Sequence, residues 1–548
     1  MKYKYVFGFY VGCIILCCCS RPEPIKYFVQ PCEFVCNYSF NDTSKWAITC
    51  RVWGLLKYYH PNITAGKHDW DNVLLDRLVS INYSSTSQMV NAELKDMVDA
   101  AGGYTLKTDV EWNDSLNMNL DLCWLDNSFL DDTLKNELKR IASLKVEYPA
   151  YYRIDFGNVM LPNEKTYNSD VNNYKYRLLA LFRYWNVIYY FSPHKYLMDK
   201  SWDKTLNDFI FPFINSADRQ SYQLSFIKLA ASLNDGHAYI SFAKYYSAEY
   251  QDIIERIGEK TVVKIDAGGL EKGDIVDCIG KLNIDDIRDS LSAQISASTQ
   301  GNKEYRINCY VAEMIFSQET EVTILRNNQK LKVNMLPVIF EKKNTELCKW
   351  VSEDIAYVDF SALKKDSIEQ MFHTLFDAKG IIFDLRKGVD ESYDPDIFAC
   401  YLSENKSTRL FPSVFPDPAH PGAFFWYEDN QAFSKNTTKC PRYNGKIVYL
   451  INEDTQSALE TIAWVGRTNY HAILIGRPTS GALGRVTWIP LPGNHRTAFS
   501  NFALFSLDKT ELQRRGITPD IEVYPTVESI KAGKDEILET AIEFFNNQ

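Results

Sequence analysis

The chain has 548 residues, more than one hydrophobic core usually supports, so we expect several domains in succession. Hydrophobic residues make up 45% of the chain and charged residues 24%, which is typical of folded globular proteins and excludes a largely disordered chain. The formal net charge is -10, and no Lys- or Arg-rich run interrupts this acidity. Nucleic acid is therefore not an expected partner, because its phosphates require a basic surface.

The N-terminus predicts an export signal with a lipid anchor. The charged start Met1-Lys-Tyr-Lys precedes an apolar stretch over residues 6–16, which is too short to cross a bilayer as a helix. Leu16 lies three residues before Cys19, an order that resembles a bacterial lipobox. We expect a lipoprotein signal peptide over residues 1–19, lipidation of Cys19 and a lipid-anchored location in the bacterial cell envelope. Lipidation at Cys17 or Cys18, or a plain secretory signal, are the alternatives.

Nine cysteines follow Cys19, and their odd number leaves at least one of them unpaired in an exported chain. We expect a disulfide of Cys32 with Cys36 or Cys50, and we interpret the others as small buried hydrophobic residues. Apart from the weak Cys32-x-x-x-Cys36, none has the spacing of a zinc site, so no metal is expected. The nine are Cys32, Cys36, Cys50, Cys123, Cys278, Cys309, Cys348, Cys400 and Cys440.

A segment of the N-terminal half recurs 132 positions later, with Trp53 in the first copy and Trp185 in the second. Each copy has apolar residues at helical spacing, a proline that ends the helix, and a second amphipathic helix opening at Trp-Asp, so each predicts a helical hairpin. We place the first repeat in an N-terminal region, residues 20–165, and the second in residues 166–250. Further matched pairs are Arg51 with Arg183, Pro61 with Pro193, Trp70 with Trp202 and Asp71 with Asp203.

Beyond the repeats, the pattern changes twice. Residues 255–340 contain short strands with alternating apolar residues, separated by Gly and Asn-Asn turns, which predicts a small β-rich module. Its Gly269-Leu-x-x-Gly273-Asp274 resembles a PDZ domain, a fold that captures extended peptides by strand addition. Residues 345–548 alternate buried strands with helices, which predicts an α/β domain.

Ser457 lies where a buried strand is followed by a helix. Unpaired backbone N–H groups face outward at such a helix start, so a serine hydroxyl there can attack a carbonyl while the N–H of Ala458 stabilises the oxyanion. The same residues also fit an ordinary capping box, in which Glu460 closes the helix start. The local pattern alone leaves both interpretations open.

Five motifs occur in the order found in the C-terminal processing and tricorn peptidases, and the chain resembles that family over roughly residues 175–545. The resemblance implies a crotonase-like α/β serine peptidase domain that needs no cofactor. The motifs are Asn234-Asp-Gly-His237-Ala, Asp384-Leu385-Arg386, Ser457-Ala-x-Glu460, the segment 472–481 ending in Thr-Ser-Gly, and Gly516-Ile-Thr-Pro519-Asp520.

The resemblance also selects the general base. Tail-specific members carry a lysine directly after the glycine of their Gly-x-x-Thr-x-Gly motif, whereas this chain has Ala482, and the guanidinium of Arg485 stays protonated. The tricorn-like version uses a histidine in a His-Ala-Tyr context, which His237 matches. Histidine titrates near neutral pH, as a base for a hydroxyl should. The first repeat has Thr105 at the equivalent position, so that copy is expected to be structural.

Two family features are altered. The carboxylate expected to orient the base falls at Gln513, with Glu511 two residues away, so we consider both residues. The turn after Asp384-Leu385-Arg386 retains only Gly388 as a second oxyanion donor, and a positive φ at Val389 or Asp390 would be strained.

The sequence therefore predicts a lipid-anchored serine endopeptidase that hydrolyses peptides or unfolded proteins. In this interpretation Ser457 is the nucleophile, His237 the base, and Ala458 with Gly388 the oxyanion hole. The alternative is a peptide-binding lipoprotein on the same fold that has lost turnover, which the altered features favour. A third interpretation is a docking component whose aromatic-rich first repeat binds a partner.

Overall fold

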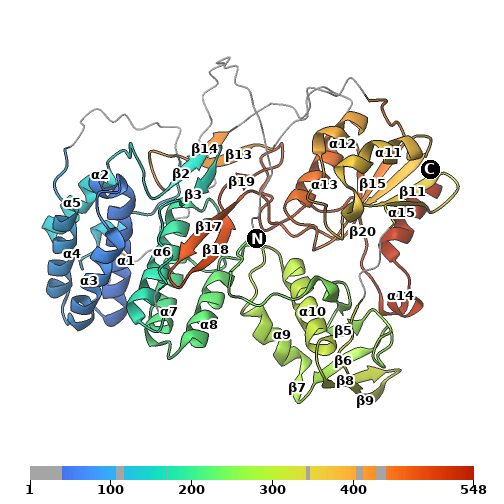
Figure 1. Ribbon diagram of the computed structural model, residues 1–548, viewed down its shortest axis with the longest axis horizontal. Coiled ribbons are helices and arrows are strands. Elements are labelled where there is room, and N and C mark those ends of the chain that lie inside the picture. Colours follow the sequence, from blue (N-terminus) through green and yellow to red (C-terminus); the bar gives the residue numbers. More distant parts are fainter. Residues whose placement is uncertain are drawn as a thin grey trace.

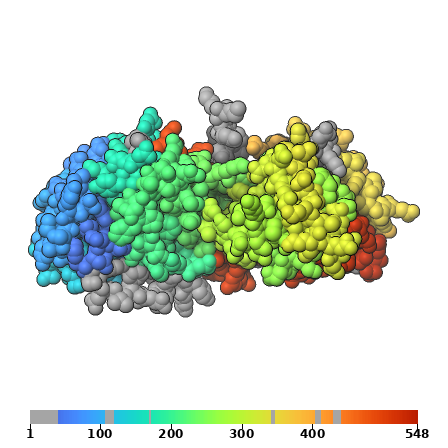
Figure 2. Space-filling view, turned by 90° about the horizontal axis from the view of Figure 1, so that it is seen from below, coloured from blue at the N-terminus to red at the C-terminus, as the bar shows by residue number. Residues whose placement is uncertain are grey.

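The structure is a computed structural model that describes residues 40–105, 117–168, 171–340, 346–402, 411–427 and 440–547. The expected signal peptide, Cys19, Cys32 and Cys36 lie outside these residues. The molecule is elongated, with a helical region at one end, a mixed α/β domain at the other and a β-rich module below them (Figures 1 and 2). The expected multidomain α/β architecture with a helical N-terminal region is thus confirmed. Within the described ranges, no helix is long and apolar enough to cross a membrane.

The helical region is built from two copies of a three-helix unit. Each helix of the second copy begins 132 positions after its counterpart, and the first two helices of each copy have matching lengths. The two copies lie side by side in Figure 1. The pairs are α1 (Asp42–Tyr59) with α6 (Tyr174–Phe191), α3 (Trp70–Tyr83) with α7 (Trp202–Asn215), and α4 (Ser87–Ala101) with α8 (Arg219–Ala231). Short elements between them are α2 (Pro61–Thr64), α5 (Asp132–Ala142), β2 (Arg153–Asp155) and β3 (Asn158–Met160).

The repeated tryptophans close each unit in the same way. The indole N–H of Trp53 donates to the carbonyl of Trp70 at 3.1 Å, and Trp70 donates back to Trp53 at 3.0 Å. Trp185 and Trp202 exchange the same two bonds at 2.8 and 2.9 Å. Because buried polar groups need partners, these reciprocal bonds explain why Trp recurs at both positions.

The α/β domain has a six-stranded sheet of order β10-β11-β12-β15-β16-β20, in which only the edge strand β10 is antiparallel. Alternate strand residues face opposite sides, so one face is covered by α11, α12 and α13 and the other by α15. The strands are β10 (Cys348–Trp350), β11 (Ile355–Asp359), β12 (Gly380–Asp384), β15 (Lys446–Ile451), β16 (Ile473–Gly476) and β20 (Ile521–Glu522). The helices are α11 (Lys365–Leu375), α12 (Pro395–Leu402), α13 (Ala458–Asn469), α14 (Val527–Ala532) and α15 (Glu536–Asn546).

The β-rich module has an antiparallel sheet of order β4-β5-β6-β8-β9 with its own apolar core. The helix α10 packs beside β4 and lies under the α/β domain in Figure 1. The elements are β4 (Ile254–Ile257), β5 (Lys260–Val263), β6 (Ile275–Ile279), β7 (Leu282–Asn283), α9 (Ile284–Ser292), α10 (Gln300–Phe316), β8 (Thr320–Arg326) and β9 (Gln329–Met335).

A hairpin of β17 (Val486–Leu491) and β18 (His495–Ser500) leaves the α/β domain and packs on the helical region. Ile489, Leu491 and Phe499 of this hairpin belong to the helical core, and Figure 1 shows the hairpin lying over α6. A second small sheet has the order β1-β14-β13-β19, formed by β1 (Asn117–Met118), β14 (Ala423–Tyr427), β13 (Ser413–Pro416) and β19 (Ala503–Leu504). Distant segments of the chain therefore share a core, which fixes the loops between them.

Two of the cysteines of the C-terminal domain are joined in a disulfide. Cys400 and Cys440 form a disulfide with their Cα atoms 5.6 Å apart, so interpreting them as unpaired buried hydrophobes is wrong. The bond ties α12 to the segment before β15. Cys50 is free and buried, so it takes no part in the expected disulfide with Cys32.

Candidate active site

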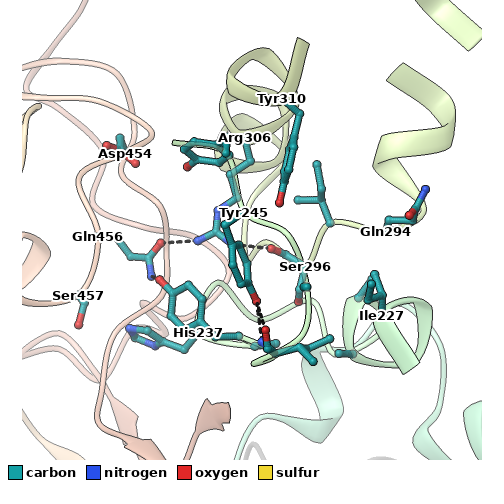
Figure 3. Close-up of a pocket in the computed structure, with 18 of the residues that line it drawn as sticks. Ile227, His237, Tyr245, Gln294, Ser296, Arg306, Tyr310, Asp454, Gln456 and Ser457 are labelled. Carbon is teal, nitrogen blue, oxygen red and sulfur yellow. Dashed lines mark hydrogen bonds between the residues drawn. The ribbon is translucent and has the colours of Figure 1, made fainter. Parts of the chain in front are cut away.

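A cavity of about 770 Å³ opens where the helical region, the β-rich module and the α/β domain meet. Four residues singled out in the sequence line it: Ser457, Ala458, His237 and Gly388. They come from three segments far apart in the chain, and Figure 3 shows the imidazole of His237 next to the Ser457 hydroxyl. Gln513 and Glu511 do not line this cavity.

Ser457 occupies a tight turn between β15 and α13. Its φ of 58° and ψ of -111° lie outside the regions that a non-glycine residue adopts freely, at a cost of roughly 1–3 kcal/mol. Ser457 lines the cavity, and the hydrogen bond that caps the helix at this turn runs from its backbone N–H to Glu460. Ala458 begins α13, and its N–H is one of the unpaired donors of the first helical turn.

Glu460 stabilises this turn by hydrogen bonds to its backbone and to the neighbouring segment 479–482. Its buried carboxylate accepts the N–H of Ser457 at 3.0 Å, the hydroxyl of Thr479 at 2.6 Å, and the N–H groups of Gly481 at 2.7 Å and Ala482 at 3.1 Å. Burial raises the pKa of Glu460 to about 7. The capping role of Glu460 and the position of Ser457 at the cavity therefore occur together rather than excluding each other.

His237 lies in the loop that follows α8 and is almost fully buried. Its Nδ1 is 2.9 Å from the hydroxyl of Ser500, at the end of β18, and its backbone N–H donates to Asp235 at 3.0 Å. Burial lowers the pKa of His237 from its usual value, the charge of Asp235 opposes this shift, and Arg306 adds to it. Although His237 and Ser457 are both described, the structure places no hydrogen bond between them; such bonds often form only with substrate.

Ser500 and the role of Asp235 were not anticipated from the sequence. Asp235 accepts the hydroxyl of Ser500 at 2.9 Å and its N–H at 2.6 Å. The side chains of Asp235, Ser500 and His237 are thus connected in that order by hydrogen bonds. Asp235 had one local signal, its position two residues before the histidine, whereas Ser500 belongs to no recognisable motif.

Gln513 and Glu511, the two sequence candidates for orienting His237, do not contact the imidazole. The side chain of Gln513 accepts the N–H of Leu483 at 3.2 Å, and its amide nitrogen donates to Asp235 at 3.4 Å. Gln513 is therefore one step removed from His237. Glu511 accepts the hydroxyl of Tyr196, and its other oxygen is 3.9 Å from a ring nitrogen of His194, so the structure does not bring it to His237.

Gly388 lies in the turn after β12, and its φ of 108° suits only glycine. The strain considered for Val389 and Asp390 does not arise, since neither has a positive φ. Gly388 and Ala458 border the same cavity, as an oxyanion hole would require.

Ala482 packs against the loop of His237. A Cβ added to Gly236 would approach the Cβ of Ala482 to 2.8 Å, so the two backbones pass closely because both residues are small. The backbone N–H of Ala482 is bound to Glu460. The place where tail-specific relatives carry lysine thus borders the segment that delivers the histidine.

The comparisons bear on the domain that holds Ser457. Residues 354–523 match the family model of Peptidase family S41. Mature CPAF complexed with lactacystin is similar in fold, with a TM-score of 0.52 and 11% identity over 68% of this chain and 99% of that chain. A putative peptidase from Parabacteroides merdae aligns over 69% of this chain and 96% of its own, with 17% identity and a TM-score of 0.42. No curated protein sequence matches the chain. The C-terminal domain of this chain therefore belongs to Peptidase family S41, a family of serine peptidases.

Proposed function

We propose that this protein is a serine endopeptidase in which Ser457 is the nucleophile and His237 the general base. The observation that carries the proposal is the meeting of both residues in one cavity, with Ser457 in a strained turn at a helix N-terminus. Strained backbone of this kind persists where function requires it. The family of the C-terminal domain supplies the reaction class, hydrolysis of a peptide bond.

The steps follow from the positions of these groups. His237 Nε2 accepts the proton of the Ser457 hydroxyl while Oγ bonds to the peptide carbonyl carbon, whose oxygen becomes an oxyanion. The N–H groups of Ala458 and Gly388 stabilise that oxyanion. His237 then gives the proton to the leaving amine, and an acyl-enzyme remains. Water attacks the ester carbonyl while His237 takes its proton. His237 then gives this proton to the Ser457 oxygen as the bond between that oxygen and the acyl group breaks, which releases the acid and restores the Ser457 hydroxyl.

The lining of the cavity suits a substrate with an apolar side chain beside the cleaved bond. Its wall formed by α8 and the following loop includes a group of apolar residues close to His237 in the chain, namely Ile227, Ala230, Ala231, Ala238 and Ile240. Small residues in this wall leave room for a bulky apolar group, whose burial contributes about 1.5–3 kcal/mol. We therefore propose extended peptides or unfolded proteins as substrates.

The finer architecture belongs to the same proposal. We assign the β4–β9 module to the PDZ-like class on the basis of Gly269 and Gly273, both at positive φ, and of its antiparallel sheet with two helices. An edge strand of that sheet would hold an extended segment by strand addition. We assign the α/β domain to the crotonase-like class. A lipid anchor at Cys19 would place the enzyme at a membrane surface in the bacterial cell envelope.

The test uses the full chain that follows Cys19. A fluorophosphonate probe, which reacts with activated serines, is expected to label the unaltered protein and to fail with Ser457→Ala and His237→Ala. A complex peptide mixture analysed by mass spectrometry should show cleavage that both variants lose, with apolar residues enriched beside the cut. If peptides bind without cleavage and the probe does not react, the protein is a binding protein on this fold.

A further inference from the structure

We propose that Asp235 and Ser500 are the positioning residues of His237, and that together they replace the carboxylate that the sequence pattern placed at residue 513. Asp235 acts through the Ser500 hydroxyl rather than by touching the imidazole. This inference rests on the proposed function, since it assigns a task to the base of that site.

All three residues are buried, with exposed fractions of 7% for Asp235, 3% for His237 and 1% for Ser500. The contacts of Ser500 with the other two are 2.6–2.9 Å long. Ser500 ends β18, whereas Asp235 and His237 lie in the loop after α8. The strand β18 is hydrogen-bonded to the loop of His237. The N–H of Ala498 donates to the carbonyl of Tyr239 at 2.9 Å, and the N–H of Ser241 donates to the carbonyl of Arg496 at 2.9 Å. Ser500 is thus held in place by a hairpin that belongs to the peptidase domain.

The arrangement dictates where the protons lie. An ionised carboxylate only accepts, so the 2.9 Å contact between Ser500 and Asp235 uses the single proton of the Ser500 hydroxyl. The Ser500 oxygen is left with lone pairs, and its 2.9 Å contact with His237 therefore requires a proton on Nδ1. In neutral imidazole Nε2 is then unprotonated. That is the tautomer a base needs if Nε2 is to take the Ser457 proton.

Gln513 completes the arrangement as a neutral donor. Its Oε1 accepts the N–H of Leu483, which directs the amide nitrogen toward Asp235 at 3.4 Å. A glutamate at 513 would set a second carboxylate against Asp235 inside the protein, where two like charges are costly. An amide at 513 and a carboxylate at 235 are therefore a matched pair, and the departure from the family pattern at 513 is compensated at 235.

The charged and titratable groups around His237 come from three elements. Asp235 lies on its own loop, Arg306 comes from α10, and His194 follows α6. Burial lowers the pKa of His194 to about 4, so this ring is neutral at pH 7. Asp235 is then the group that stabilises a protonated His237 during the reaction, against burial and the charge of Arg306.

The direct test is the protonation state of His237, read by nitrogen NMR of protein labelled with ¹⁵N-histidine in the inactive Ser457→Ala background. At pH 7.5 we expect a protonated Nδ1 and an unprotonated Nε2. Asp235→Asn, whose amide donates to the Ser500 oxygen and turns the hydroxyl proton toward His237, should populate the opposite tautomer. Glu511→Gln, which removes a buried carboxyl that lies beside His194 and does not contact His237, is the matched control and should leave the His237 signals unchanged.

Kinetics provide the second measurement. With Ser457 present, Asp235→Asn and Ser500→Ala should lower kcat by about 100-fold to 10,000-fold and change KM little, while Ser500→Thr, which keeps the hydroxyl, restores activity. Thermal melting identifies variants that do not fold. If Ser500→Ala does not fold, the activity of Ser500→Thr provides the test of the Ser500 hydroxyl instead. An unchanged tautomer in Asp235→Asn, or a tautomer change in Glu511→Gln, overturns the proposal. Failure of the unaltered enzyme to cleave any peptide, with the expected tautomer present, overturns the proposed function instead.

Discussion

Arg306 joins the loop of the proposed base to the loop of the proposed nucleophile through Gln456. One guanidinium nitrogen of Arg306 donates to the side chain of Gln456 at 2.8 Å and to the carbonyl of Gly236 at 2.9 Å, and a second nitrogen donates to the carbonyl of Ser296 at 2.8 Å. Figure 3 shows the bond to Gln456 beside Ser457. Because Arg306 is on α10, the β-rich module sets the distance between the two reacting side chains.

We expect Arg306→Lys to lower kcat/KM by about 10-fold to 100-fold, because the single ammonium nitrogen cannot occupy the positions of the two guanidinium nitrogens that hold these acceptors, and a displacement of about 1 Å has that effect. Steady-state kinetics with a fluorogenic peptide provide the measurement. Arg256→Lys is the control: Arg256 lies in the same module, away from the cavity, where it pairs with the surface carboxylates of Glu259 and Asp285 and donates to the hydroxyl of Thr261. Equal kinetics in both variants would show that Arg306 does not align the site.

The pH profile should follow His237. Its pKa is lowered by burial, so the imidazole is neutral and able to accept a proton at all pH values above a midpoint below 6.5. Activity is therefore expected to be constant near pH 7 and to fall as the pH drops through that midpoint. Arg306 lowers the pKa and Asp235 raises it, so Arg306→Met should move the midpoint of kcat/KM up and Asp235→Asn should move it down. Midpoints that move the other way would assign the titration to another group.

The two helical repeats exchange their charged partners. Arg51 of the first copy pairs with Asp203 of the second, and Arg183 of the second pairs with Asp71 of the first at 2.6 Å. All four side chains are buried. Each copy therefore neutralises a buried charge of the other, which explains why both Arg and Asp recur at the offset of 132 positions.

Arg183→Met should lower the free energy of unfolding by about 3–5 kcal/mol, because it leaves the buried carboxylates of Asp71 and Glu164 with Lys57 as the one cation between them, so that one buried negative charge is uncompensated. Urea unfolding followed by circular dichroism measures this change. Arg77→Met, which breaks partly exposed pairs with Glu93 and Asp96 on the surface of the first copy, should cost about 1 kcal/mol or less. Similar losses in the two variants would contradict a structural role for the exchanged pairs.

The disulfide of Cys400 and Cys440 should stabilise the peptidase domain by about 2–4 kcal/mol. Cys440→Ala or reduction is expected to lower the melting temperature, and peptide mapping without reduction should recover the linked peptides. Cys278→Ala, at a free cysteine of the β-rich module, is the control. Peptide mapping that finds Cys400 unlinked would remove the basis for this prediction.

What the sequence predicted depended on how local each signal was. The helical repeat could be found because tryptophan, proline and aspartate recur in register along the chain, and Ser457 because strand, serine and helix are contiguous. Ser500 could not be found, since it reaches His237 only after a hairpin of the C-terminal domain folds onto the helical region. Likewise, Cys400 and Cys440 are 40 positions apart in the sequence, and no motif pairs them.

Gln513 was identified from the sequence as the residue in the place of an expected carboxylate, and its environment explains the amide. If Asp235 carries the charge, the two positions must be coupled. Gln513→Glu alone would place a carboxylate where an amide nitrogen now lies 3.4 Å from Asp235, so it should lower both stability and kcat. In an Asp235→Asn background the same change meets a neutral amide and should cost less.

A double-mutant cycle over the unaltered protein, Gln513→Glu, Asp235→Asn and the double variant tests this coupling by urea unfolding and by kcat. We expect the double variant to be more stable than the sum of the single effects predicts, by about 0.5–3 kcal/mol, as found for residues in direct contact. Combining Asp235→Asn with Glu511→Gln is the matched control and should be additive, because no contact joins Glu511 to Asp235. Strict additivity in the first cycle would mean that residue 513 does not sense the charge of Asp235, and its amide would then need another explanation.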